Sequence, residues 1–174
     1  MKKIIFILVT LATVIACQNK VRYTQKSAEI ETYKKSIKDY EMANWESLAT
    51  HYADTAKIMN NVTDKNGISV AQNIELNKKD ISVLSSYGFV ADKSEYEMVE
   101  TDKGKTWVNF WGLWQGRLKA NDQLIEIPVH LTAQFINGKI VSEHGYWDNT
   151  AIVTALMKLE ENTPTEQPLA TTKE

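Results

Sequence analysis

The chain has 174 residues, with 20 lysines and arginines against 22 aspartates and glutamates. This length suits one domain with an ordinary hydrophobic core, and the near balance of charge gives no electrostatic case for a nucleic-acid partner, which would need a basic face. Cys17 is the only cysteine, so no disulfide can form within the chain. We therefore expect a single domain that binds no nucleic acid and is stabilised by its core alone.

The first 16 residues are predicted to be a signal peptide. Met1-Lys2-Lys3 precede an apolar run that ends at Ala16 and is shorter than the roughly 20 residues of a membrane span. Val14-Ile15-Ala16-Cys17 resembles the bacterial lipobox, which implies export and a lipid on Cys17 that anchors the protein to a bacterial membrane. Because Gln18 follows the cysteine, the resemblance implies the periplasmic side of the outer membrane in a host with two membranes. An ordinary signal peptide with an incidental cysteine is the alternative.

Residues 17–26 are polar and are predicted to tether the lipid to a domain spanning residues 27–160. That domain begins with a helical pattern, in which four apolar side chains recur at steps of three and four residues on one helix face. These side chains are Ile30, Tyr33, Ile37 and Tyr40. Asn44 is a candidate N-cap for a second, short helix that carries Trp45, Leu48 and Tyr52. A short strand is expected at residues 56–60.

Ser69 and Gln72 have the spacing of a capping box, which predicts the start of a third helix. Its buried side is predicted to comprise Val70, Ile74, Ile81 and Leu84. Gly88 is predicted to end it.

From Phe89 onward the hydrophobic period changes to two, which predicts strands at about 89–100, 105–119, 123–136 and 139–148. Asn137-Gly138 is a strong signal for a two-residue hairpin between the last two strands. A short helix is expected over residues 149–160, and the tail at 161–174 has little to bury and is predicted to be disordered. The expected fold is α+β: a cone-shaped barrel of a curved antiparallel sheet packed against three N-terminal helices.

Two segments resemble the SnoaL-like branch of the nuclear transport factor 2-like superfamily. Residues 44–54 (NWESLATHYAD) resemble its second helix and the Tyr-Ala-Asp before its first strand, and Phe135 to Val141 with Tyr146-Trp147-Asp148 resemble its final hairpin. The resemblance implies a cone-shaped pocket and often a homodimer. It does not imply one function, because relatives include isomerases, cyclases, dehydratases and epoxide hydrolases as well as ligand-binding domains.

The chain departs from two of the superfamily's catalytic patterns. The aspartate base of ketosteroid isomerases aligns with Asn60, whose amide cannot accept a proton as a carboxylate does. The tyrosine of their oxyanion site aligns with Ser36, one helical turn from Tyr33. Epoxide hydrolases need an Asp-Arg-Asp set, and only Arg22 and Arg117 are present.

SnoaL-type cyclases use a histidine and an aspartate as acid–base groups, for which His130, His144 and Asp148 are the candidates here. A hairpin at residues 137–138 brings His130 roughly opposite Gly145, so the two histidines are expected to be near neighbours. On a flat ladder, however, they would face opposite sides of the sheet. Surface or dimer-interface histidines, and an Asp148 that caps the following helix, are the structural alternatives.

A pocket is predicted to be lined by Tyr33, Trp107, Asn109, Trp111, His130 and Trp147. On the strand at 105–119, one set of side chains holds Trp107, Asn109 and Trp111 and the other holds Phe110 and Trp114. Either set could line the pocket while the other packs against the core or a partner subunit. His51 has no nearby histidine or cysteine in sequence, so no metal site is expected, and no cofactor is implied.

Three functions remain open from the sequence. The first is a membrane-tethered domain that binds a small apolar ligand in its cone. The second is an enzyme that transfers protons on a carbonyl-containing substrate, and the third is an interaction module that dimerises or contacts another envelope protein. The arrangement of ionisable groups around the cone distinguishes among them.

Overall fold

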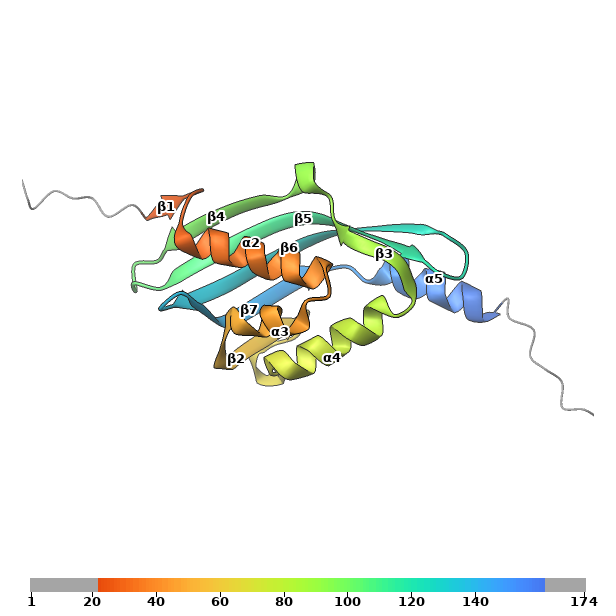
Figure 1. The fold of residues 1–174 in the computed structure, drawn as a ribbon, viewed down its shortest axis with the longest axis horizontal. Helices are drawn as coiled ribbons and strands as arrows, with labels where there is room; N and C mark the ends of the chain where they lie inside the picture. The colour runs from red at the N-terminus through yellow and green to blue at the C-terminus, as the bar shows by residue number, and fades with distance from the viewer. Residues whose placement is uncertain (1–21, 162–174) are drawn as a thin grey trace, which may run out of the picture.

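The computed structural model describes residues 22–161 (Figure 1). The predicted signal peptide, Cys17 and all but the first residue of the predicted tail lie outside the described residues. The end of the predicted tether, Tyr23–Thr24, forms the short strand β1. None of the helices that the structure describes is long and apolar enough to cross a membrane.

The described chain folds as an α+β domain in the predicted order of elements. The helices are α2 (Ala28–Glu41), α3 (Trp45–Thr50), α4 (Val70–Ile81) and α5 (Thr150–Glu161). The longer strands are β2 (Tyr52–Asn60), β3 (Leu84–Phe89), β4 (Glu95–Glu100), β5 (Thr106–Leu118), β6 (Leu124–Ile136) and β7 (Lys139–Trp147). Short 3₁₀ turns at Asp64–Asn66 and Ala91–Lys93 complete the connections.

The sheet is mixed and not wholly antiparallel as predicted. Its order is β1-β4-β5-β6-β7-β2, and β3 pairs with β5 beside β4. Strand β2 runs parallel to β7, whereas the other neighbours are antiparallel. Helices α2, α3 and α4 lie over one face of the curved sheet, here called the inner face (Figure 1).

The helices begin where the capping signals predict but the elements between them differ. Ser69 and Gln72 form the predicted capping box. Asn44 holds the N-cap position of α3 as predicted, but its side chain makes no capping hydrogen bond and instead donates to Asp39 at 3.4 Å. Tyr52 belongs to β2 and not to the helix. Strand β2 therefore starts four residues earlier than predicted.

The third helix ends earlier than predicted. It stops at Ile81, and Leu84 and Gly88 lie in strand β3, where they pair with Leu118 and Gln115. The predicted strand at 89–100 is divided by the 3₁₀ turn into the end of β3 and the whole of β4.

The hydrophobic core lies between the inner face and the helices. Ile30 and Tyr33 of α2 are fully buried against Val108 and Phe110 of β5 and Ala133 of β6. On β6 the alternation is as predicted, with Ile125, Ile127, Leu131, Ala133 and Phe135 buried. A second apolar cluster centres on Ala155 of α5, packed with Leu84, Leu118, Ile125 and Ile127.

The hairpin between β6 and β7 contains a bulge that changes which side chains face inward. Asn137 and Gly138 have φ of 51° and 75°, the positive values that a type I′ turn needs. Phe135 pairs with Ile140 but Gln134 pairs with Ser142, so Val141 is an extra residue on β7. The predicted pairing of His130 with Gly145 is therefore wrong by one residue, and His130 pairs with Tyr146. Beyond the bulge, Glu143, Gly145 and Trp147 face inward.

Candidate functional site

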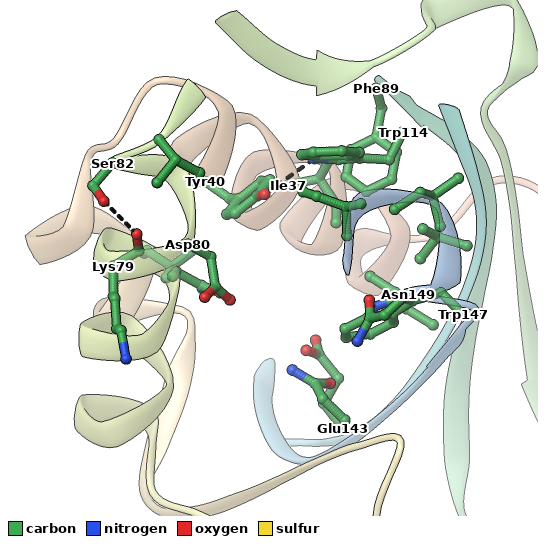
Figure 2. A pocket seen from close by; sticks show the side chains of 18 of the residues that line it. Ile37, Tyr40, Lys79, Asp80, Ser82, Phe89, Trp114, Glu143, Trp147 and Asn149 are labelled. Atoms are coloured by element: carbon green, nitrogen blue, oxygen red, sulfur yellow. Dashed lines mark hydrogen bonds between the residues drawn. The ribbon is translucent and has the colours of Figure 1, made fainter. Parts of the chain in front are cut away.

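A cavity of about 480 Å³ lies between the inner face and helices α2, α4 and α5. Its volume is in the range of small-molecule sites. Most of its wall is apolar or aromatic, with contributions from nearly every element of the domain (Figure 2). The principal apolar side chains are Ile37, Tyr40, Phe89, Trp114, Val129, Leu131, Trp147, Ile152 and Val153.

Glu143 is the buried ionisable group in this wall, with only 6% of its surface exposed. Its Oε2 accepts hydrogen bonds from the hydroxyls of Tyr33 at 2.9 Å and Tyr52 at 3.0 Å. Over residues 22–161 it has no ion-pair partner, and both hydrogen bonds reach the same oxygen. Burial raises the pKa of the Glu143 carboxyl, and the two tyrosine hydrogen bonds only partly oppose that effect.

Tyr33 of α2 and Tyr52 of β2 hold the carboxyl group of Glu143, and Tyr52 also lines the cavity. Burial raises the pKa of Tyr33 and of Tyr52 well above the usual value, and the neighbouring carboxylate adds to the effect. Both hydroxyls therefore remain protonated donors at neutral pH. No hydrogen bond from a described residue reaches Oε1 of Glu143.

Asn60 lines the cavity at the end of β2. Its Nδ2 donates to Oδ1 of Asn73 at 3.1 Å, and its Oδ1 is buried without a hydrogen-bond partner among the described residues. Gly145 makes this arrangement possible, because a Cβ there would lie 2.5 Å from Oδ1 of Asn60 and 2.5 Å from the Trp147 ring. A side chain at position 145 would displace the wall beside Glu143.

A second carboxyl group, that of Asp80 on α4, points into the cavity, whereas the Lys79 side chain points away from it (Figure 2). Burial raises the pKa of Asp80, and Lys79 opposes that effect. On the opposite side, Trp147 Nε1 donates to Oδ1 of Asn149 at 2.6 Å. Trp114 Nε1 donates to the hydroxyl of Tyr40 at 3.1 Å. Both indole N–H groups are thus used by neighbours in the wall.

The six residues predicted to line the pocket divide between the two faces of the sheet. Trp147 lines the cavity, and Tyr33 supports Glu143 from behind. Trp107, Asn109, Trp111 and His130 lie on the outer face, because their strand positions alternate with the buried Val108, Phe110 and Leu131. Of the two sets on β5, it is therefore the one with Phe110 and Trp114 that faces the core and cavity.

The candidate acid–base groups His130 and His144 also lie outside the cavity. They flank Tyr146 in a row of rings, with centroids 6.2 Å and 6.5 Å from it and planes within 13°. Trp111 stacks on His130 at 4.8 Å, and Trp107 lies 6.1 Å from His144. We call Trp107, Trp111, His130, His144 and Tyr146 the outer aromatic row. Trp111 and Tyr146 are 42% and 51% exposed.

Asp148 has the structural role that was the alternative for it. Its Oδ1 accepts from the backbone nitrogen of Thr150 at 2.8 Å and from the Thr150 hydroxyl at 2.6 Å. These hydrogen bonds lower its pKa. The predicted histidine–aspartate set is therefore not assembled in the cavity. In the part of the chain that the structure describes, no three His, Cys, Asp or Glu side chains are grouped as a metal site requires.

Glu143 is the site residue that sequence reasoning missed. Its spacing of two and four residues from Gly145 and Trp147 placed all three on one strand face. Trp147 on that face was predicted to line the pocket, but Glu143 was assigned no role, and the bulge at Val141 that separates this face from His130 was not foreseen. The signal available in the sequence was only that Glu143 alternates with Gly145 and Trp147 along a predicted strand.

No protein-family model and no curated protein matches the sequence. Solved structures match the fold. A protein named a SnoaL-like polyketide cyclase from Shewanella denitrificans has a TM-score of 0.57 at 15% identity, covering 76% of this chain and 99% of that one. AclR, named a hydroxylase, from Streptomyces galilaeus has a TM-score of 0.60 at 12% identity, covering 75% and 96%.

A third match is a protein with a ketosteroid isomerase-like fold from Catenulispora acidiphila, solved in complex with trimethylamine. Its TM-score is 0.55 at 12% identity, and the match covers 71% of this chain and 90% of that one. Together these structures establish that the chain has the SnoaL-like, nuclear transport factor 2-like fold, as the sequence resemblance implied. At these identities the likeness concerns the fold.

Proposed function

We propose that this domain binds a small, mainly apolar molecule in the cavity, with its polar group against Glu143. The observation that carries the proposal is one buried carboxyl group, held by two tyrosine hydroxyls, in an otherwise apolar and aromatic wall. Apolar walls with a few convergent polar groups are typical of ligand sites. The structure with trimethylamine supports the proposal, because it is a case of this fold solved with a small organic molecule.

Native mass spectrometry of the domain purified gently from its host tests for a retained molecule. In addition, binding of the neutral fluorescent probe N-phenyl-1-naphthylamine tests the cavity directly. We expect Val153→Trp, at the cavity wall on α5, to weaken probe binding about tenfold or more. Met157→Trp is the matched control, because Met157 is exposed one turn further along α5 and does not line the cavity. Equal binding by both variants would contradict the proposal.

Proton transfer on a carbonyl-containing substrate is the second candidate function, and one observation favours it. Burial raises the pKa of Glu143 toward the range of a general base, and one of its oxygens is free for a substrate. Glu143 replaces His130, His144 and Asp148 as the proposed acid–base group. In this proposal, deuterium exchange at the α-carbon of cyclohexanone, followed by NMR in D₂O, is accelerated by the wild type and falls about 100-fold in Glu143→Gln.

We also propose that the protein is an outer-membrane lipoprotein attached through Cys17. The argument is the lipobox-like sequence, and the test is metabolic labelling with a radioactive fatty acid. The wild type is expected to take up label and Cys17→Ala to take up none. Label in the variant would contradict the assignment.

The outer aromatic row is the surface that we propose for a homodimer, since Trp111 and Tyr146 expose large apolar area there. Light scattering after size exclusion is expected to give a dimer for the wild type. A Trp111→Ala and Tyr146→Ala double variant is expected to give a monomer. A wild-type monomer at high micromolar concentration would contradict this proposal without affecting the cavity.

A further inference from the structure

The charges that face the cavity are of one sign. Glu143 at one side and Asp80 on α4 both point their carboxyl groups inward, while the Lys79 side chain points away (Figure 2). Lys79 is the only lysine, arginine or histidine among the described residues that line the cavity. Two carboxyl groups, the buried one of Glu143 and the exposed one of Asp80, therefore line the cavity, and no cationic side chain of the described lining points into it.

A buried carboxylate without a positive partner is unfavourable, because desolvation removes the stabilisation that water gave to the charge. The two tyrosine hydroxyls compensate Glu143 only partly, since both bind Oε2. Burial consequently raises the pKa of Glu143. Burial also raises the pKa of Asp80, where the charge of Lys79 opposes the effect. A positively charged ligand would supply the partner that the buried Glu143 lacks, and it would also be attracted by the exposed carboxyl group of Asp80.

The walls between these carboxyl groups suit an organic cation rather than a hydrated metal ion. The rings of Tyr40, Phe89, Trp114 and Trp147 line the cavity, and the faces of aromatic rings attract ammonium groups. Apolar side chains of β6 and α5 make the rest of the wall, which suits a hydrocarbon body.

We propose that the ligand is an organic amine, with its ammonium group between the carboxyl groups of Glu143 and Asp80 and its apolar part against the aromatic wall. This inference rests on the proposed binding function of the same cavity. It adds the chemical class of the ligand and assigns Asp80 as a second contact residue.

Three probes that share one ring separate charge from apolar binding: cyclohexylmethylamine, cyclohexylmethanol and cyclohexanecarboxylate. Isothermal titration of the wild-type domain at pH 7.5 is expected to show the amine binding at least tenfold more tightly than the alcohol, and the carboxylate binding most weakly. Glu143→Gln is expected to abolish the preference for the amine while the alcohol still binds. Asp80→Asn is expected to reduce the preference about threefold, since Asp80 is less buried than Glu143.

Glu126→Gln is the matched control, because Glu126 is exposed on the outer face of β6, where it accepts a hydrogen bond from Gln115. It is expected to leave all three affinities unchanged. Asp80→Asn decides the question if Glu143→Gln fails to fold. Equal binding of amine and alcohol by the wild type, or an undiminished preference in both carboxyl variants, would overturn the amine proposal and leave the binding function standing. Failure of all three probes at millimolar concentration would overturn both.

Discussion

The two faces of the sheet use the same kinds of residue for different purposes. On the inner face, buried and half-buried aromatic side chains line the cavity with one buried carboxyl group, which has no cationic partner among residues 22–161. On the outer face, tryptophans, histidines and Tyr146 form a row in which Trp111 and Tyr146 are exposed and the other rings are half-buried. The comparison teaches that burial, rather than residue type, determines which side chain has a pKa that suits acid–base chemistry. Glu143 has a shifted pKa because it is desolvated, although histidine is the residue usually sought first.

The largest difference between the faces is expected in stability, at two adjacent residues of β5. Phe110 is completely buried, and Phe110→Ala is expected to lower the free energy of unfolding by about 3–5 kcal/mol. Trp111 beside it is on the outer face, and Trp111→Ala is expected to cost less than about 1 kcal/mol in the monomer. Urea unfolding measured by circular dichroism checks both. Similar losses for the two variants would show that the outer face is part of the core.

The next difference concerns tyrosine hydroxyls. Tyr33→Phe removes a hydrogen bond to a buried carboxyl group, so we expect a loss of about 1.5–3 kcal/mol in the same unfolding assay. Tyr146→Phe on the outer face removes an exposed hydroxyl and is expected to change stability by less than about 0.5 kcal/mol. A neutral Tyr33→Phe would mean that Glu143 does not depend on this donor.

The contribution of Glu143 to the free energy of unfolding is also expected to depend on pH. A carboxyl group whose pKa is raised on folding stabilises the folded state fully below its unfolded pKa, and this contribution is lost as pH rises through the folded pKa. The unfolding free energy of the wild type is therefore expected to fall relative to that of Glu143→Gln between pH 4.5 and pH 8. Unfolding curves of both proteins across this range provide the measurement. A constant difference would show that Glu143 is not shifted.

The smallest effect is expected at the helices that close the inner face. Asp39 of α2 accepts from Ser47 at 2.6 Å and contacts His51 Nε2 at 2.7 Å, which joins α2 to α3. Burial would raise the Asp39 pKa, but the hydrogen bonds from Ser47, His51 and Asn44 outweigh it and lower the pKa.

The contribution of Asp39 to stability is therefore present above its unfolded pKa and is lost as pH falls through the folded pKa, below about pH 4. Asp39→Asn is expected to flatten the acid side of the stability profile slightly, as followed by thermal unfolding between pH 3 and pH 6. If Asp39→Asn loses stability with falling pH as steeply as the wild type, Asp39 does not join the helices in this way.

Local signals in the sequence predicted most of the fold. The capping box at Ser69 and Gln72, the period of two on β6 and the Asn137-Gly138 turn each depend on neighbours in the chain, and each is confirmed. The end of α4 was predicted too late, because Leu84 fits a helical period but pairs with Leu118, more than 30 residues away. Tertiary pairing overrode the local pattern there.

The candidate site could be predicted only in part. Trp147 was correctly predicted to line the pocket. Whether His130 shares the face of Trp147 and Gly145 depends on one extra residue, Val141. A one-residue change of register exchanges every side chain between the two faces, so the predicted pairing put His130 on the face of Gly145 and Trp147, whereas His130 pairs with Tyr146 on the outer face. The parallel pairing of β2 with β7, which brings Tyr52 next to Glu143, is likewise a long-range contact that no local motif encodes.

The tryptophans provide the most direct test of the claim that the inner cavity, and not the outer face, is the ligand site. The indole N–H groups of Trp114 and Trp147 bond to Tyr40 and Asn149 in the cavity wall, whereas Trp107 and Trp111 lie in the outer aromatic row. An NMR titration with cyclohexylmethylamine, with the indole signals assigned by Trp→Phe variants, separates the faces in one experiment. Shifts at Trp114 and Trp147 with none at Trp107 and Trp111 are the predicted result. Shifts confined to Trp107 and Trp111, or none at saturating probe, would contradict the account.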